Sequence, residues 1–152
     1  MLISRIIILA LTIFSLQACN AMKGQSDMEN IVRLMETNSP AKYEAVMHSF
    51  VKSAKSSDID KMIALTSEVT IKQMGIDALK RHYQKDTIPA LKACVKISEG
   101  GDIVYIDESQ AKIGSGWVYH KTCTYGENET VGIRFVILKE NGRIALTSFG
   151  LG

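Results

Sequence analysis

The chain has 152 residues, of which 46% are hydrophobic and 22% are charged. This length and composition fit one folded domain with a hydrophobic core and argue against a wholly disordered chain. The formal net charge is +2, and the lysines and arginines are scattered along the sequence. A nucleic-acid-binding protein usually carries a basic patch or stripe, so we expect no nucleic-acid partner.

The N-terminus carries a short apolar run after a single positive charge. Arg5 precedes the segment Ile6 to Phe14, whose residues are apolar apart from Thr12. A helix that spans a bilayer needs about 20 residues, so this run is too short to be one. A positive start followed by a brief apolar segment is typical of a secretory signal peptide. The alternative is a buried N-terminal helix of the mature fold.

The signal-like segment ends in the stretch Leu16-Gln17-Ala18-Cys19. An aliphatic residue stands three positions before the cysteine, and a small residue stands just before it. The stretch resembles the lipobox of bacterial lipoproteins, although Gln17 departs from the small or hydroxylated residue that is usual there. The resemblance implies that the Cys19 thiol carries a lipid and that the chain is cleaved before it.

These boundaries divide the chain into a signal peptide at 1–18, a lipidated tether at 19–25 and a single domain at 26–152. The resemblance places the protein in the bacterial cell envelope, where it is bound to a membrane through its lipid. Asn20 after the cysteine favours the outer membrane. The alternative is ordinary cleavage after Ala18 or Ala21, which leaves Cys19 free or removed.

The chain has three cysteines, and an odd number in an exported protein requires an explanation. If Cys19 holds the lipid, Cys94 and Cys123 remain as a pair in a compartment that permits disulfides. We therefore predict a Cys94–Cys123 disulfide, with two buried free thiols as the alternative. No Cys-x-x-Cys occurs and the three histidines are scattered, so we expect no metal or other cofactor.

Helical periodicity dominates the first half of the domain. Ser26 and Glu29 form a capping box that predicts a helix near residues 27–37. The clearest helix follows Pro40, because apolar residues from Tyr43 to Ala54 recur on one face. A short helix is expected to open at Ser57 or Asp58. Two further segments are predicted: 68–74 as a brief extended piece, and 75–86 as a helix that stops before Pro89.

From Ala90 onward the hydrophobic period changes from 3.6 to 2, which indicates strands. Asn141-Gly142 separates two strong strands and predicts a tight hairpin. Helices followed by an antiparallel meander predict an α+β fold, with N-terminal helices packed on one face of a sheet of about five strands. The expected strands are 91–97, 102–108, 116–125, 130–139 and 143–149.

The order of elements resembles the nuclear transport factor 2-like superfamily over roughly Ala41 to Gly152. The resemblance rests on AVMHSFVKSAKSSDIDKMIALTSEV, MGIDALKRHY and the closing hairpin GIRFVILKENGRIALTSFG. It implies a strongly curved sheet that wraps around helices to form a cone with a pocket. Members include isomerases and dehydratases, which place an acid or base with a phenol or histidine in that pocket, and also proteins that only bind or scaffold.

Alternation along residues 117–125 decides which side chains could face such a pocket. His120 lies on the face opposite the aromatic residues, so it points to solvent if the aromatic face is concave. This placement argues against His120 as a general base, and we assign no catalytic residue. The aromatic side chains line a pocket or, alternatively, simply fill the core. The candidate pocket-lining residues are Tyr83, Tyr105, Trp117, Tyr119, Tyr125 and Phe135.

The sequence therefore favours an envelope lipoprotein that binds a small apolar molecule or an envelope protein partner without catalysis. The alternative is a small isomerase- or dehydratase-type enzyme that uses the cone pocket. These functions differ in one feature, since an enzyme needs an acid or base that faces the pocket. A further possibility is a homodimer formed through the outer face of the sheet, which would require an exposed apolar patch.

The lipid anchor can be tested with a Cys19→Ala variant, which removes the thiol that would accept the lipid. We expect the wild-type protein to fractionate with membranes and the variant to accumulate as an unprocessed precursor. Membrane fractionation and mass spectrometry of the N-terminus measure both properties. A variant that stays membrane-bound while no unprocessed form accumulates would contradict the anchor.

Overall fold

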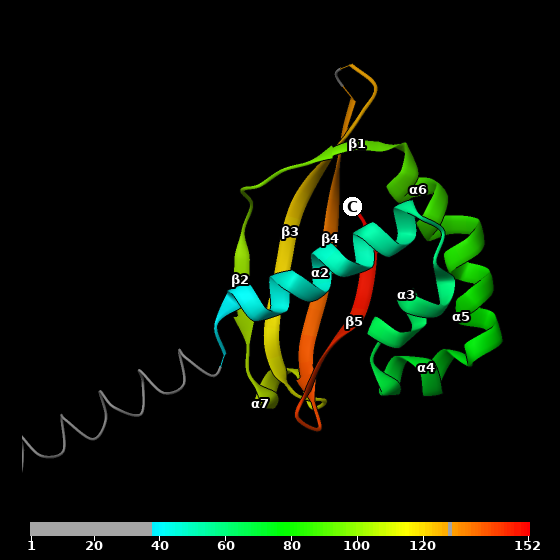
Figure 1. Ribbon diagram of the computed structural model, residues 1–152. Coiled ribbons are helices and arrows are strands. Elements are labelled where there is room, and N and C mark those ends of the chain that lie inside the picture. Colours follow the sequence, from blue (N-terminus) through cyan, green and yellow to red (C-terminus); the bar gives the residue numbers. More distant parts are fainter. Residues whose placement is uncertain (1–37, 128) are drawn as a thin grey trace, which may run out of the picture. The chain divides into compact units, whose positions relative to one another are not determined.

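The computed structural model describes residues 38–127 and 129–152. Pro40–Gly152 forms one compact unit, shown in Figure 1. The expected signal peptide, the tether with Cys19 and the helix near residues 27–37 lie outside the described residues. The description below therefore concerns the folded domain alone.

Helix α2 (Pro40–Lys55) crosses the inner face of the sheet (Figure 1). Pro40 stands at its first position, where the fixed φ of proline favours helix and its missing N–H is not needed. Tyr43, Met47, Phe50 and Ala54 are all buried, as the helical spacing predicts. Since these residues recur three or four apart, they form one stripe that faces the strands. The predicted long helix is confirmed.

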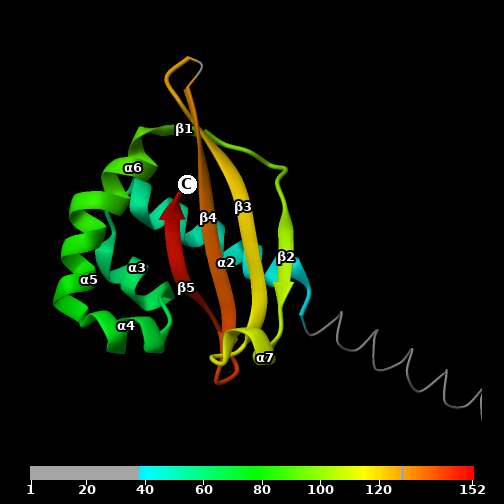
Figure 2. The same cartoon turned by 180° about the vertical axis from the view of Figure 1, so that it is seen from behind.

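Three shorter helices follow α2 and gather beside the β5 edge of the sheet (Figures 1 and 2). They are α3 (Ile59–Leu65), α4 (Glu68–Met74) and α5 (Ile76–His82). Asp58 caps α3 by accepting a hydrogen bond from the Lys61 backbone N–H, at 3.0 Å. This cap gives the polar turn before α3 a physical role.

Residues 68–74 form helix α4, so the predicted extended piece is wrong. Ser67 is the local N-cap of this helix, because its hydroxyl accepts a hydrogen bond from the Thr70 backbone N–H at 3.2 Å. The Glu140 carboxylate accepts from the N–H groups of Glu68 and Val69, at 3.1 and 3.2 Å. A carboxylate at a helix N-terminus satisfies free donors and complements the helix dipole. This second cap comes from a distant strand and overrides the β-branched composition of the segment.

The helix after Gly75 also continues past Pro89, so its predicted end before that proline is wrong. A π-helical turn, η1 (Tyr83–Thr87), follows α5 and leads into α6 (Ile88–Ala93). In a regular helix the Pro89 ring would clash with a carbonyl of the preceding turn. The wider π-helical turn, in which the Ile88 N–H donates to the Tyr83 carbonyl, lies directly before it. Such a turn changes the backbone path locally while the chain remains helical.

Five antiparallel strands form one sheet with the path β1-β3-β4-β5, and β2 pairs with β3 on the same edge as β1. The predicted α+β arrangement of helices on an antiparallel sheet is confirmed. The sheet is open and uncurled, where the resemblance implies a strongly curved one (Figure 1). The strands are β1 (Cys94–Ile97), β2 (Ile103–Ile106), β3 (Ser115–Tyr125), β4 (Glu129–Glu140) and β5 (Arg143–Leu151).

The hairpin between β4 and β5 has the predicted two-residue turn, since Glu140 pairs with Arg143. Asn141 and Gly142 both have positive φ, at 49° and 84°. A type I′ turn requires this left-handed backbone at both positions, which Asn and Gly tolerate best. The sequence signal and the observed turn therefore share one physical cause.

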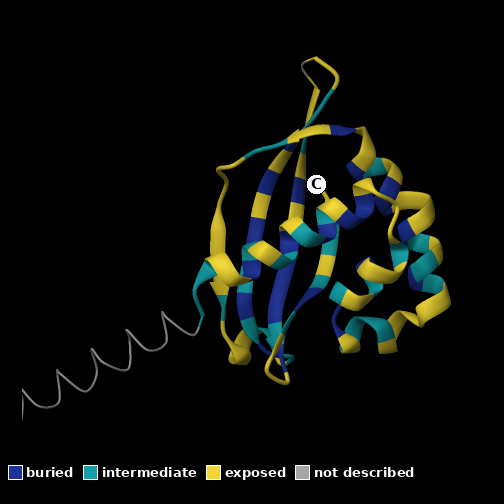
Figure 3. Ribbon diagram, viewed as in Figure 1, coloured by how far each residue is buried: buried dark blue, intermediate teal, exposed yellow. Residues whose placement is uncertain are grey.

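Burial alternates over residues 119–123 of β3 and 132–135 of β4, whereas residues 135–138 of β4 are all buried (Figure 3). Tyr119, Cys123 and Phe135 are fully buried on the inner face, against α2. On the outer face a smaller cluster joins Val118, Val136 and Leu138 to three part-buried residues: Ile106 of β2, Ala111 of the short helix α7 (Glu108–Ala111), and Ile113 after that helix. The rest of that face includes the exposed His120 and Arg134. A homodimer through this face stays a prediction.

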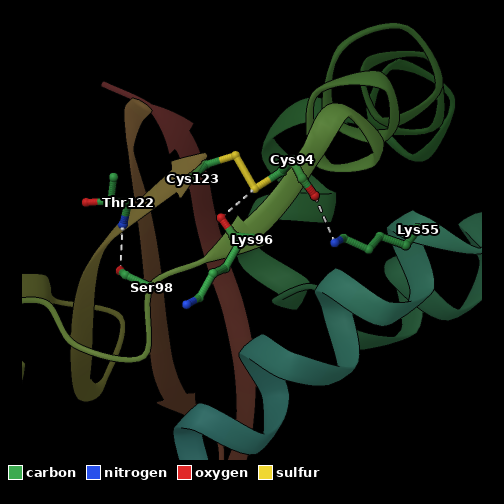
Figure 4. The surroundings of a disulfide bond; sticks show 6 residues. All are labelled: Lys55, Cys94, Lys96, Ser98, Thr122 and Cys123. Carbon is green, nitrogen blue, oxygen red and sulfur yellow. Dashed lines mark hydrogen bonds between the residues drawn. A yellow bond between two sulfur atoms is a disulfide. The ribbon is translucent and has the colours of Figure 1, made fainter. Parts of the chain in front are cut away.

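Cys94 and Cys123 form the predicted disulfide, which joins β1 to the central strand β3 (Figure 4). Both residues are buried. The bridge spans a sequence separation of 29 residues and fixes the strand that follows α6. Because β1 has only four residues, the covalent link adds a constraint that its own ladder cannot supply.

We expect a Cys94→Ala, Cys123→Ala double variant to be less stable than the oxidised wild type by about 3–4 kcal/mol. The physical reason is the loop-closure entropy that the bridge removes from the unfolded chain. Urea unfolding followed by circular dichroism measures the difference, with reduced wild type as the matched control. Equal free energies of unfolding for the variant and the oxidised protein would contradict the prediction.

Candidate functional site

A cavity of about 660 Å³ lies between α2 and the sheet edge formed by β1 and the residues that follow it. This volume is within the range of small-molecule sites, about 300–1,000 Å³. We call it the α2 pocket. Its lining residues are Glu44, Met47, His48, Val51, Lys52, Lys55, Ser56, Ile97, Ser98, Glu99 and Lys121.

One wall of the pocket is a second stripe on α2, beside the stripe that packs on the strands. Glu44, His48, Val51 and Lys55 follow one another at spacings of three or four residues and so lie on one face. Met47 is buried and belongs to both the core and the lining. Helix α2 therefore contributes one face to the core and the neighbouring face to the pocket.

The facing wall is the segment 94–99, which two lysines hold at its ends. The Lys55 ammonium donates to the Cys94 carbonyl at 2.9 Å, a bond visible in Figure 4. The Lys121 ammonium donates to the Glu99 carbonyl at 2.8 Å. Ser98 also pairs with Thr122, whose N–H donates to the Ser98 hydroxyl at 2.9 Å. The disulfide and these bonds fix the wall against α2 and β3.

Lys121 is the least expected member of the pocket, since its side chain is only 2% exposed. It stands on the inner face of β3 between Tyr119 and Cys123, which are fully buried. Its Nζ lies 3.6 Å from the Glu44 carboxylate, which is itself 3.9 Å from His48 Nε2. A buried ammonium needs such partners, because desolvation of an unpaired charge is strongly unfavourable.

The lining combines an apolar strip with a surplus of basic groups. Met47, Val51 and Ile97 supply the apolar surface. The charged side chains are His48, Lys52, Lys55 and Lys121 on the basic side, and Glu44 and Glu99 on the acidic side. The pocket is therefore amphipathic, with more positive than negative side chains even when His48 is neutral.

The aromatic residues that the sequence proposed as pocket lining do not line this cavity. Tyr83, Tyr119 and Phe135 are buried in the core, in accordance with the alternative that they fill it. Tyr125 is half-buried at the end of β3. Tyr105 is exposed on β2 and meets Trp117 edge-on, with ring centroids 5.1 Å apart.

The buried tyrosines hold elements together through their hydroxyl groups. Tyr119 donates to the Pro40 carbonyl at 2.7 Å and so ties β3 to the start of α2. The Tyr83 hydroxyl lies 2.8 Å from Thr66 Oγ1. Burial raises the pKa of Tyr119, and the nearby Glu44 charge adds to this effect. Burial also raises the pKa values of Tyr83 and Tyr43. These phenols therefore stay neutral at physiological pH.

The three histidines all lie at the surface to some degree. His120 is exposed on the outer face of the sheet, as its place on the strand indicates. His82 is partly exposed on α5, with Nδ1 2.9 Å from the Asp86 carboxylate. His48 lies off the core stripe of α2, and its side chain is 72% exposed. It nevertheless stands at the rim of the α2 pocket, a role that the sequence analysis did not assign.

The sequence did not predict the α2 pocket because most of its residues are polar and they come from three separate segments. One signal was present in the sequence: Lys121 interrupts the otherwise apolar and aromatic inner face of residues 117–125. A lysine in such a position must have a buried partner or a cavity that reaches it. That inference would have pointed to this edge of the sheet, although not to α2 as the opposite wall.

The described part of the chain has neither a cluster of metal ligands nor a helix suited to a bilayer. No group of three or more His, Cys, Asp or Glu side chains within it could hold a metal ion. No helix within it is both long and apolar enough to cross a membrane. Comparisons with protein-family models, curated proteins and solved structures give no match for the chain.

The raised pKa of Tyr83 predicts how stability depends on pH. In the unfolded chain the phenol ionises near pH 10. The folded state keeps it neutral, so this contribution is complete below about pH 10 and is lost as pH rises towards the folded pKa. A Tyr83→Phe variant lacks this ionisation and also lacks the bond to Thr66, worth about 1 kcal/mol at neutral pH.

We therefore expect the stability difference between wild type and Tyr83→Phe to shrink above pH 10, by up to about 1.4 kcal/mol per pH unit. Urea unfolding at pH 8 and at several alkaline pH values measures it. Tyr105→Phe is the matched control, because Tyr105 is an exposed tyrosine. A difference that stays constant from pH 8 to pH 11 would contradict the prediction.

Proposed function

We propose that the chain is an envelope lipoprotein, anchored through Cys19, that binds a small molecule in the α2 pocket without catalysis. The single observation that carries the binding function is the pocket itself, with a volume of about 660 Å³ and an apolar strip between charged groups. Ligand sites combine apolar surface, which covers the ligand, with fixed polar groups that orient it, and this pocket has both.

Three features support a binding site that is formed before the ligand arrives. The disulfide holds β1 to β3, and the Lys55 and Lys121 ammonium groups each bond a carbonyl of the pocket wall. Helix α2 is fixed by the core residues of its other stripe. A site whose walls are already ordered loses less conformational entropy when it binds.

The location of the binding function is proposed from the sequence. The lipobox-like stretch ending at Cys19 supports a lipid anchor, and the polar tether supports a domain held close to the membrane surface. The outer membrane is the proposed site of attachment. A tethered domain meets ligands at the high effective concentration of the envelope or the membrane surface.

A second candidate is an isomerase- or dehydratase-type enzyme, and one observation favours it. Glu44 lines the pocket with a side chain that is 34% exposed, close to both Lys121 and His48. A carboxylate and an amine that face one cavity could act as base and acid. If so, Glu44→Gln would abolish turnover of a ligand while leaving its binding intact. Pure binding predicts that no bound ligand is chemically altered.

Binding can be tested by filling the pocket. Val51 faces the cavity from α2, and a Val51→Trp variant would place a large ring where the ligand lies. Val104→Trp is the matched control, because Val104 is exposed on β2 and does not line the pocket. The probe is 8-anilinonaphthalene-1-sulfonate, whose fluorescence rises in apolar sites.

We expect wild type and Val104→Trp to bind the probe at a single saturable site and Val51→Trp to lose that site. Because Val51 is only half-buried, the variant should keep its fold, which circular dichroism verifies. The proposed function is contradicted if the probe fails to bind wild type, or if Val51→Trp binds it as well as the control does.

A further inference from the structure

We propose that the α2 pocket selects anionic amphiphiles, molecules with a carboxylate or phosphate head on an apolar chain. This inference rests on the proposed binding function and names the class of its ligand. The Lys121 and Lys55 ammonium groups bind the head, and Met47, Val51 and Ile97 contact the chain.

Each of the two ammonium groups has more N–H donors than its bond to a wall carbonyl uses. A lysine ammonium has three N–H donors. Lys55 uses one on the Cys94 carbonyl, and Lys121 uses one on the Glu99 carbonyl. The bonds immobilise both side chains, whose ordering normally opposes ligand binding. The Lys55 ammonium therefore keeps donors for a ligand at one end of the wall, and the Lys121 ammonium lies between the Glu99 carbonyl and the Glu44 carboxylate at the other.

The basic and acidic side chains of the α2 pocket do not balance one another. Glu44 approaches Lys121 and His48, so its carboxylate is already shared between two basic groups. Over the described residues, no carboxylate lies within 4.0 Å of the Lys55 or Lys52 ammonium. The pocket consequently holds positive charge that the protein itself does not neutralise. A ligand of negative charge complements this field, whereas a cationic ligand is repelled.

Lys121 occupies a position on β3 where an apolar side chain is expected. A strand residue between two fully buried neighbours would be most stable as an apolar side chain, and a buried ion pair is often no better than such a replacement. Lys121 instead lines the cavity, and its ammonium contacts the Glu99 carbonyl and the Glu44 carboxylate, which belong to two other lining residues. Features that do not favour stability are found preferentially at functional sites.

The apolar residues of the pocket provide a place for the apolar part of the ligand. Met47, Val51 and Ile97 lie on the two facing walls, so an apolar chain between them is covered from both sides. Methionine is flexible and polarizable, and it adapts to chains or rings of different shape. Burial of a chain contributes about 0.8 kcal/mol per methylene group. The head therefore decides the charge of the ligand, and the chain supplies much of the affinity.

The test compares ligands that share one apolar chain and differ only in the head. Isothermal titration calorimetry of the whole mature protein with dodecanoate, dodecyl phosphate, dodecanol and dodecylamine, each below its micelle concentration, gives the affinities. We expect the two anions to bind at least about tenfold more tightly than the alcohol and the amine. The relative affinities of dodecanoate and dodecyl phosphate show which anionic head is preferred.

The variants assign the selectivity to Lys121. Lys121→Met should lower affinity for the anions at least about tenfold and leave the alcohol unchanged, and Lys121→Arg should restore anion binding in part. Lys72→Met is the matched control, because Lys72 is exposed on α4 away from the pocket. If Lys121→Met fails to fold, Lys55→Met makes the same measurement at an exposed position.

The outcomes separate this inference from the function on which it rests. Equal affinities for all four heads, or anion binding unaffected by both Lys121→Met and Lys55→Met, would overturn the ligand class while a small-molecule site remained. Failure of every ligand, together with failure of the fluorescent probe in wild type, would overturn the binding function itself.

Discussion

The packing of α2 across the inner face of the sheet is the interaction on which both the core and the pocket depend. One stripe of the helix buries Tyr43, Met47, Phe50 and Ala54 against the strands. The neighbouring stripe is left facing the sheet edge, where it lines the α2 pocket. Since a helix is rigid over its sixteen residues, fixing the first stripe also fixes the second. The same residues that stabilise the fold thus position the candidate site.

The opposite wall depends on constraints of a different kind. Segment 94–99 includes a strand of four residues at a sheet edge, which is weak by itself. The disulfide to Cys123 and the lysine bonds to the carbonyls of Cys94 and Glu99 compensate for this weakness. A disulfide, side-chain packing and lysine hydrogen bonds therefore act together at one edge of the domain. A preformed amphipathic cavity is the expected product of such a combination.

The elements that could be predicted from the sequence are those with a local cause. The spacing from Tyr43 to Ala54 predicts α2, and Asn141-Gly142 predicts the hairpin, because each pattern acts within a few residues. Helix α4 and the continuation past Pro89 could not be predicted, since one needs the cap from Glu140 and the other a π-helical turn. The pocket required contacts between α2, 94–99 and Lys121, which lie far apart in sequence. The aromatic residues proposed for it serve largely as core.

The central claim is that the α2 pocket holds a small molecule in the native envelope. The most direct measurement is native mass spectrometry of the protein purified from its own membranes, with Val51→Trp prepared in parallel. We predict that the wild-type domain carries a non-covalent adduct that the filled variant lacks, and that the adduct leaves as an intact amphiphilic anion. A wild-type protein with no adduct, or an adduct of equal abundance in Val51→Trp, would contradict the account.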